Sequence, residues 1–564
     1  MSTTSTKSVG KSRAPREKTN ATSRTSDLPD EMSERTWRLS ALAILVVGAF
    51  LRLYDLALVP LHHDEGVNGN FLVTLVRDGN YIYNPENYHG PTLYYFSAII
   101  PWLTRFLGGK SFSEAHGLTT FNIRFVTAAF GVATIGLALL LRKRLGTIGA
   151  LSAAALIAIS PGAVYLSRYF IHESLYVFFT LGIIVAAVKY YDTGATVYVI
   201  LTALSAGLMV ATKETWIING PVLLIALLTT TLYFLIREKL SDKSIFRARK
   251  DSDVEEEDFL ERAGGPISLA TVALVGFTVF IVVNVLFYSS FFKNYPKGVN
   301  DALQTLSLWR KRTHEHEHKW SQYIYWLLQE EGLIVILGGV GAMIAVWRAN
   351  NRFAVYIGQF AFGLLAAYSL VGYKTPWIGL NFIVPLALIS GYALDVGFQK
   401  LREFQQPNFF FVPAALIVLF CGYQLYQLNF VHYDDDRYVY VYAHTRRETL
   451  VMLEQIDRVA NQLKTGNDTG IALLSPEYWP LPWYFRNYHR VGYYQKVVDT
   501  TEPIIIASRG QEEEMQTTFG ERYQLIDSSQ LSDARIDPEK NPGGSFNLRP
   551  GVDLLLYVRK DVAK

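Results

Sequence analysis

The chain has 564 residues, of which 50% are hydrophobic and 14% are aromatic, whereas only 18% are charged. An average soluble protein has roughly 25% charged residues, so the composition argues against a large soluble enzyme and for a polytopic membrane protein. The formal net charge of +3 gives no sign of a nucleic-acid partner, which usually requires a concentrated basic patch. Since Cys421 is the only cysteine, an intrachain disulfide and a cysteine-based zinc site are both excluded.

Residues 1–36 are polar and rich in serine and threonine, and up to Arg24 they contain six basic residues against one acidic residue, Glu17. This composition predicts a disordered tail on the cytoplasmic side. A cleaved signal peptide is disfavoured, because the next apolar run is long and no small-residue cleavage pattern follows it.

Eleven apolar runs approach or reach the length of about 20 residues that a membrane-spanning helix needs. They lie at 39–59, 123–141, 148–166, 174–190, 195–211, 216–236, 267–288, 332–347, 353–371, 378–397 and 409–428. A twelfth run, 91–108, is broken by Pro101 and Arg105, and we predict that it forms a helix along the outer membrane surface.

The basic residues predict the topology, because cytoplasmic loops carry an excess of lysine and arginine. If 91–108 does not span, the basic clusters at 142–144, 237–250, 348–352 and 399–402 all fall on the side of the N-terminal tail. We therefore expect a multi-pass protein of a prokaryotic cell membrane with its N-terminus in the cytoplasm. The transmembrane domain would cover 37–429, with outer loops at 60–122 and 289–331 and a cytoplasmic loop at 237–266.

Residues 430–564 have the pattern of a small α/β domain, which this topology places outside the cell. The segments 446–464 and 509–520 are predicted helices, and 470–475, 503–508 and 552–560 are predicted strands. The expected fold class is thus a polytopic α-helical membrane protein of about 11 transmembrane helices, with outer-surface helices and a C-terminal extracytoplasmic α/β domain.

The first outer loop, "LVPLHHDEGVNG" (58–69), places His62, His63, Asp64 and Glu65 in a row at the membrane edge. One interpretation is that Asp64 caps a helix that begins at Glu65. The functional interpretation is that a carboxylate at the interface serves as a base or as a metal ligand.

Further ionisable residues lie in other outer loops: Arg168, His172 and Glu173 in "SRYFIHES", Lys213 and Glu214 in "ATKETW", and Lys374 in "GYKTPW". An Arg168–Glu173 ion pair and snorkelling lysines are ordinary explanations. Neighbouring helical residues do not face each other, so Lys213 is expected to point away from Glu214. Together, carboxylates and cations on one side predict a site that binds a lipid-linked phosphate and activates a hydroxyl.

The loop "RTHEHEHKW" (312–320) carries three histidines. His314 and His318 are four residues apart, but the order H-E-H-E-H lacks the HExxH pattern of zinc proteases. We expect a solvated loop, with a role in metal binding or substrate gating as the alternative.

The order of "HHDEG", "YHGPTLYY" (88–95), "RFVTAAFGVATIGLALLLRKRLG" (124–146) and "ISPGAVYLSRYFIHE" (159–173) resembles the GT-C membrane glycosyltransferases, above all the dolichyl-phosphate-mannose–protein mannosyltransferase and aminoarabinose transferase branch. The segments "YKTPW" (373–377), "YVYAHT" (440–445) and "EYWPLPWYFRNY" (477–488) are similar to the prokaryotic flippase-activity-associated subfamily. The resemblance implies inverting transfer of a sugar from a polyprenyl-phosphate donor to a protein or an envelope glycan or lipid, on the outer face of the membrane.

The resemblance also implies roles for individual residues. Asp64 matches the acidic residue that acts as a base or orients the acceptor, and Glu65 is the second catalytic candidate. His172 and Glu173 occupy an acidic position that binds a divalent metal in the oligosaccharyltransferase branch. The implied lipid-phosphate cations are Arg168, Lys213 and Lys374, and the implied substrate contacts are His63, His89, Tyr373 and Trp377. His89 matches the histidine of the family's HPP motif, whereas Gly90 departs from its first proline.

A GT-C-type glycosyltransferase is therefore the leading hypothesis, with the bilayer, the polyprenyl-phosphate sugar and the acceptor as its partners. One alternative is a non-catalytic, transporter-like protein that assists a flippase of lipid-linked sugars. Few charges in the spans and no paired broken helices argue against a transporter. A second alternative is a scaffold whose outer domain binds envelope partners.

Overall fold

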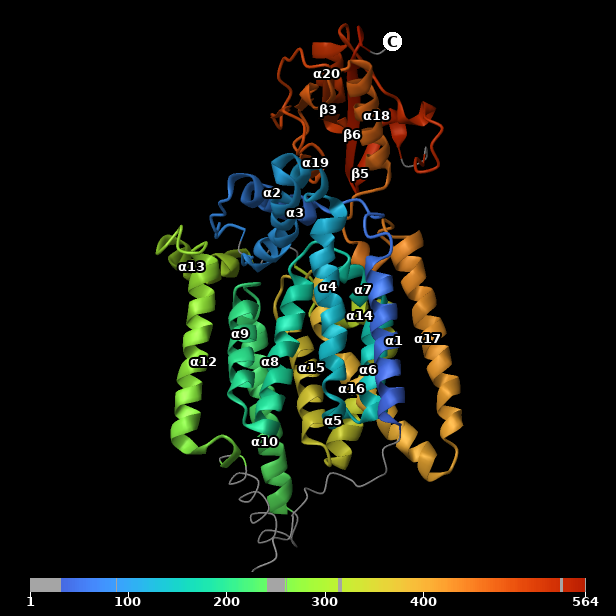
Figure 1. Ribbon diagram of the computed structural model, residues 1–564. Helices are drawn as coiled ribbons and strands as arrows, with labels where there is room; N and C mark the ends of the chain where they lie inside the picture. Colours follow the sequence, from blue (N-terminus) through green and yellow to red (C-terminus); the bar gives the residue numbers. More distant parts are fainter. Residues whose placement is uncertain are drawn as a thin grey trace, which may run out of the picture.

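The computed structural model describes residues 32–87, 89–240, 259, 261–312, 317–537 and 541–562. Figure 1 shows a bundle of long, roughly parallel helices with a separate α/β domain at one end. Most of the predicted basic tail, at 1–31, and the acidic stretch at 251–258 lie outside the described residues.

The helices of the bundle account for all eleven predicted spans. They are α1 (Glu34–Leu53), α4 (Thr120–Leu139), α6 (Thr147–Ile159), α7 (Pro161–Ser167), α8 (Glu173–Thr193), α9 (Thr196–Val210), α10 (Trp216–Leu240), α12 (Gly265–Tyr288), α14 (Gln322–Arg348), α15 (Arg352–Leu370), α16 (Gly379–Glu403) and α17 (Phe411–Tyr426), with the short α5 (Arg142–Leu145) between α4 and α6. Within the described ranges, nine helices are long and apolar enough to cross a membrane, and the number is ten if α6 and α7, which are bent by 60°, count as one span. The eleventh predicted span, α9, is apolar but has 15 residues.

Three helices lie at the same end of the bundle as the α/β domain (Figure 1): α2 (His63–Asp78), α3 (Thr92–His116) and α13 (Lys297–Arg312). α3 contains the run that was predicted not to span, and it is not among the helices apolar enough to do so. Phe106 and Leu107 of α3 are 86% and 71% exposed, as expected for side chains that contact lipid at a membrane surface.

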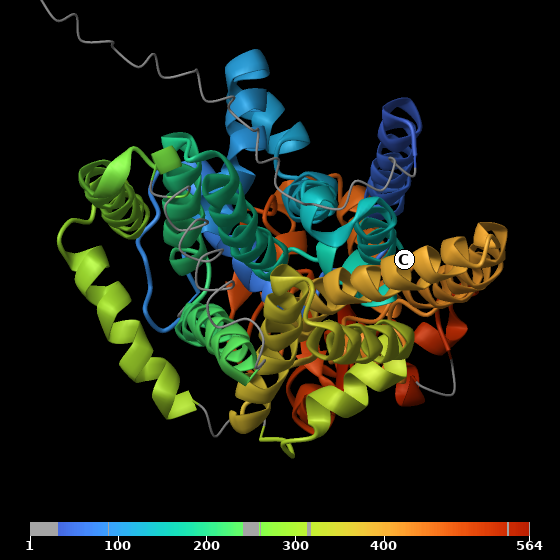
Figure 2. The same ribbon diagram turned by 90° about the horizontal axis from the view of Figure 1, so that it is seen from below.

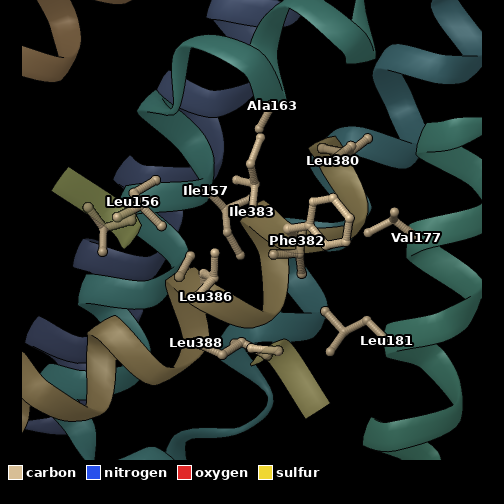
Figure 3. Close-up of a cluster of buried hydrophobic side chains, with 14 of the residues drawn as sticks. Leu156, Ile157, Ala163, Val177, Leu181, Leu380, Phe382, Ile383, Leu386 and Leu388 are labelled. Carbon is tan, nitrogen blue, oxygen red and sulfur yellow. The ribbon is translucent and has the colours of Figure 1, made fainter. Parts of the chain in front are cut away.

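The core of the bundle lies around α16, whose apolar stretch is 89% buried. Figure 3 shows Phe382, Ile383 and Leu386 of α16 among side chains of α6 and α8, including Ile157 and Leu181. Seen along the bundle in Figure 2, α1, α12 and α17 lie at the rim, and at most 17% of their apolar stretches is buried. Such exposed apolar helices are stable in a bilayer and not in water.

Two buried arginines connect the end of α1 with α6 and α7: Arg52 binds the bend between them, and Arg168 lies at the C-terminus of α7. A break in a helix leaves backbone carbonyls without their usual partners. The guanidinium of Arg52 donates to the carbonyl oxygens of Ile157 (2.9 Å) and Ala158 (3.1 Å). In return, Arg168 donates to the carbonyl oxygens of Tyr54 (2.6 Å) and Asp55 (2.8 Å), just past the end of α1. These contacts hold the loop before α8 in place.

The C-terminal domain is built on a six-stranded mixed sheet with the order β2-β1-β3-β6-β4, and β5 also pairs with β6. Its elements are β1 (Gly470–Leu473), β2 (Arg490–Tyr493), β3 (Ile504–Ser508), β4 (Tyr523–Leu525), β5 (Phe546–Arg549), β6 (Val552–Arg559), α18 (Glu448–Gln462), α19 (Leu481–Tyr484) and α20 (Glu512–Phe519). The three predicted strands correspond to β1, β3 and β6, and the two predicted helices to α18 and α20. β2, β4 and β5 have at most four residues each and were not predicted.

Candidate functional site

A cavity of about 260 Å³ lies where the predicted outer loops meet beside the first turn of α2. It is lined by His63, Asp64, Val67, Asn68, Asn87, His89, Ile171, His172, Glu173, Lys213, Glu214, Thr215, Ile218, Tyr368, Val371, Tyr373, Thr375, Trp377 and Ile378. Eight of the eleven predicted site residues are among them, and Glu65, Arg168 and Lys374 are not. The loops that were predicted to lie on the same side of the membrane therefore meet at one cavity.

The N-terminus of α2 fixes the position of Asp64. α2 begins at His63, and its N-cap is His62, whose Nδ1 accepts a hydrogen bond from the backbone N–H of Asp64 (3.0 Å). The interpretation of Asp64 as the helix cap is therefore wrong. The side chain of Asp64 is 41% exposed, and among the described residues its oxygens accept no hydrogen bond; the nearest basic atom, Nδ1 of His62, is 4.0 Å away. The carboxylate faces a cavity enclosed by protein rather than open solvent, and the resulting loss of hydration raises the pKa of Asp64, which the neighbouring His63 and His89 partly offset.

Glu65 points away from the cavity into the protein. It is 0% exposed, and its oxygens accept from Nε (2.7 Å) and Nη2 (2.6 Å) of Arg124. The backbone N–H groups of His62 (2.9 Å) and Phe170 (2.7 Å) complete its shell. These contacts tie the start of α2 to α4 and to the loop between α7 and α8, which is a structural role.

The other two carboxylates of the cavity each have a basic partner. Glu173 forms a buried ion pair with Lys213, and Glu214 accepts from Nδ1 of His89 at 2.9 Å. Lys213 and Glu214 thus point to different partners, as their adjacent positions predicted. Burial opposes ionisation of Glu214, but His89 and Lys213 hold its pKa below the ordinary value. Glu214 was noted in the sequence in the same turn as Lys213, but a role at the site was predicted only for Lys213.

His172 is buried beside His89, with ring centroids 4.8 Å apart. Its Nε2 donates to the carbonyl oxygen of Gly90 (3.0 Å), and burial lowers its pKa well below the ordinary value. Gly90 lies so close to the chain that an added Cβ would come within 2.0 Å of the carbonyl oxygen of Ala211. This contact explains why no proline stands at position 90.

The cavity residues do not fit a metal centre in this arrangement. Glu173 is neutralised by Lys213, and His172 is engaged by the backbone of Gly90. Across the part of the chain that the structure describes, no group of three or more His, Cys, Asp or Glu side chains is arranged to hold a metal ion.

Two predicted phosphate-binding cations are bound to backbone carbonyls instead. Arg168 holds the end of α1, as described above. Lys374 is 1% exposed, and its Nζ donates to the carbonyl oxygens of Ser369 (3.1 Å) and Val371. Of the three predicted cations, Lys213 alone lines the cavity.

The histidine-rich loop reaches the rim of the cavity. Residues 313–316, with His314, lie outside the described residues. Beyond them, Glu317 forms a β-bridge with Tyr373, and the backbone N–H of His318 donates to the carbonyl oxygen of Gly372 (3.2 Å). This end of the loop therefore packs against the segment that carries Tyr373 and Trp377.

The late motifs noted in the sequence join the C-terminal domain to the site. In "YVYAHT", the carbonyl oxygen of Tyr442 lies 3.2 Å from Nε2 of His62, and the ring of His444 lies 5.4 Å from that of His62. In "EYWPLPWYFRNY", Pro480 and Trp483 pack on Gly66 and Gly69 of α2.

Comparisons with known proteins agree with this architecture. A family model described as dolichyl-phosphate-mannose-protein mannosyltransferase matches residues 99–242. The crystal structure of ArnT from Cupriavidus metallidurans bound to undecaprenyl phosphate is similar, with a TM-score of 0.55 and 14% identity, over 93% of this chain and 98% of ArnT. The archaeal oligosaccharyltransferase AglB from Archaeoglobus fulgidus, in complex with an inhibitory peptide and a dolichol-phosphate, gives a TM-score of 0.50 and 13% identity, over 84% of this chain and 70% of AglB. The comparison with curated proteins gives no significant match.

Proposed function

We propose that this chain, which has the fold of the GT-C membrane glycosyltransferases, transfers a sugar from a polyprenyl-phosphate-linked donor to a hydroxyl of a protein or an envelope glycan or lipid, with inversion at the anomeric carbon. The polyprenyl phosphates in the ArnT and AglB structures support this class of donor. Figure 1 shows α2, whose first turn lines the cavity, at the end of the bundle opposite the basic α5, and this supports a reaction on the outer face of a prokaryotic cell membrane.

The carboxylate of Asp64 is the observation that carries this proposal. Glu173 forms an ion pair with Lys213 and Glu214 accepts a hydrogen bond from His89, whereas the Asp64 oxygens accept no hydrogen bond within the described ranges. A carboxylate that faces a cavity without a partner, and whose pKa is raised, is suited to accept a proton.

In the proposed reaction, an acceptor hydroxyl oxygen attacks the anomeric carbon of the donor while Asp64 takes the hydroxyl proton. The bond between the anomeric carbon and the phosphate oxygen breaks, and its electron pair leaves with the polyprenyl phosphate. Lys213 and His89 are the cavity groups that would stabilise this charge. This assignment replaces Arg168 and Lys374, whose side chains are held by the backbone.

The test is transfer from a radiolabelled polyprenyl-phosphate sugar by the purified full-length protein in lipid vesicles. We expect Asp64→Asn to lower the transfer rate by about 10²–10⁴-fold, the usual contribution of a general base. Asp78→Asn, at the exposed far end of the same helix, is the matched control and should leave the rate unchanged. Full activity of Asp64→Asn would remove Asp64 as the base. Movement of the lipid-linked sugar across the bilayer without any transfer would favour the flippase-associated alternative.

A further inference from the structure

A row of aromatic side chains leads from the cavity onto the C-terminal domain. It begins at His63, which lines the cavity, and the ring of Trp479 lies 6.2 Å from the His63 ring. Tyr478 follows at 5.7 Å from Trp479, and Tyr493 of β2 at 5.3 Å from Tyr478. Tyr493 and its neighbour Tyr494 are 40% and 44% exposed. The row therefore connects the cavity with an open surface.

The row is held in a fixed position relative to Asp64. An added Cβ on Gly66 would come within 2.5 Å of Pro480, so the segment that carries Trp479 packs directly on α2. Nη1 of Arg549 in β5 donates to the carbonyl oxygen of Trp479 (3.1 Å) and lies 3.4 Å from Nδ1 of His63. The C-terminal domain and the helix that carries Asp64 thus meet at the start of the row.

Polar groups lie beside the row. Arg549 forms an ion pair with Glu477, whose side chain is 54% exposed. Nε2 of Gln495 lies 3.5 Å from the hydroxyl of Tyr478, and the tyrosines of the row add hydroxyls. A sugar ring has the matching chemistry, because its C–H faces are apolar and its rim carries hydroxyl donors and acceptors.

We propose that the row formed by His63, Trp479, Tyr478 and Tyr493 binds a chain of sugar units and directs its terminal hydroxyl to Asp64. The inference rests on the proposed function and narrows its acceptor to a glycan. An extended peptide could instead pair with the edge strand β2. However, β2 has four residues, and the rings of the row come from three separate segments rather than from one strand.

Binding can be measured without transfer by saturation-transfer NMR on the detergent-solubilised full chain. The probes are hexasaccharides of glucose, of mannose and of N-acetylglucosamine, and a polyalanine hexapeptide is the competing class. We expect at least one hexasaccharide to bind, and Trp479→Ala and Tyr493→Ala to weaken its binding at least tenfold. Tyr493→Ala changes a partly exposed side chain and guards against misfolding of Trp479→Ala. Tyr325→Ala, which removes an exposed tyrosine from the first turn of α14, is the matched control.

Asp64→Asn separates this inference from the proposed function, because it should lower the transfer rate by about 10²–10⁴-fold and leave hexasaccharide binding intact. If hexasaccharides bind through the row but no variant of the chain transfers sugar, the transferase proposal fails and the glycan site stands. If Tyr493→Ala and Trp479→Ala bind as tightly as the parent, if none of the hexasaccharides binds, or if only the peptide binds, the glycan row is refuted.

Discussion

Glu65→Gln is the sharpest test of how the two adjacent carboxylates divide their roles. Oε1 of Glu65 accepts from Nε of Arg124 and from the backbone N–H of Phe170, whereas Oε2 accepts from Nη2 of Arg124 and from the backbone N–H of His62. A glutamine replaces one of these oxygens by an NH₂ group. In either orientation that group would face two N–H donors, because each oxygen accepts two hydrogen bonds.

The size of the effect follows from these contacts. Two hydrogen bonds to a charged group, at about 1.5–3 kcal/mol each, give a loss of about 3–6 kcal/mol. Breaking one side of a buried ion pair gives a similar figure of about 3–5 kcal/mol, since Arg124 and Glu65 are 1% and 0% exposed. We therefore expect the free energy of unfolding to fall by about 3–5 kcal/mol, which is a factor of roughly 10² or more in the folding equilibrium.

The chain contains its own reporter for this measurement. Cys421 is the only cysteine and is 3% exposed, so its labelling by a thiol-reactive fluorophore during a denaturant titration follows unfolding. Asp64→Asn, the same acid-to-amide change one residue earlier, is the control and should shift stability by no more than about 0.5 kcal/mol. A Glu65→Gln protein that keeps full stability and loses transfer would refute the structural role and return Glu65 to the catalytic residues.

Three further predictions follow from the same contacts. Arg168→Gln should lower the free energy of unfolding, because the guanidinium binds carbonyl oxygens just past the end of α1. The KM for the donor should stay unchanged in a transfer assay, and a raised KM with normal stability would contradict this structural role. Burial holds the pKa of both His62 and His444 at about 3, below the ordinary 6.5, so they stay neutral when folded and stability should fall with decreasing pH below about 6.5. The free energy of unfolding should change by up to roughly 1.4 kcal/mol per pH unit for each histidine. If His444→Gln showed the same dependence of stability on pH as the parent, His444 would not be one of the responsible groups. Gly66→Ala, which must displace Pro480, should increase hydrogen exchange in 477–488, whereas Gly136→Ala, with open space around it, should not.

The membrane fold could be predicted from the sequence because its determinants are local. Each span is a run of apolar residues whose length the bilayer fixes, and the excess of lysine and arginine selects the side of each loop. The loops that were predicted to lie on one side of the membrane carry Asp64, His172, Glu173 and Lys213. All four side chains line one cavity. The strands β2, β4 and β5 were missed because their short sequences mix polar and apolar residues, so no apolar run marks them. β1 also has four residues, but all four are non-polar and buried, and the sequence predicted it.

The partners of individual charges were not predictable, because they depend on backbone groups that only the tertiary structure leaves free. Arg168 has the composition of a phosphate-binding residue, yet it binds carbonyls at the end of α1. Lys374 likewise binds the carbonyls that end α15. A sequence shows that such a cation is present in a loop but not which carbonyls lack a helical partner.

The helical turn explains why neighbouring residues of one motif separate into cavity and core. Successive side chains on a helix with 3.6 residues per turn point about 100° apart. Asp64 in the first turn of α2 therefore faces the cavity while Glu65 faces Arg124. The turn that carries Lys213 and Glu214 divides in the same way, because one side chain pairs with Glu173 and the other with His89. This short acidic motif thus supplies one carboxylate that faces the cavity and one structural anchor, and the anchor holds the first turn of α2 so that Asp64 faces the cavity.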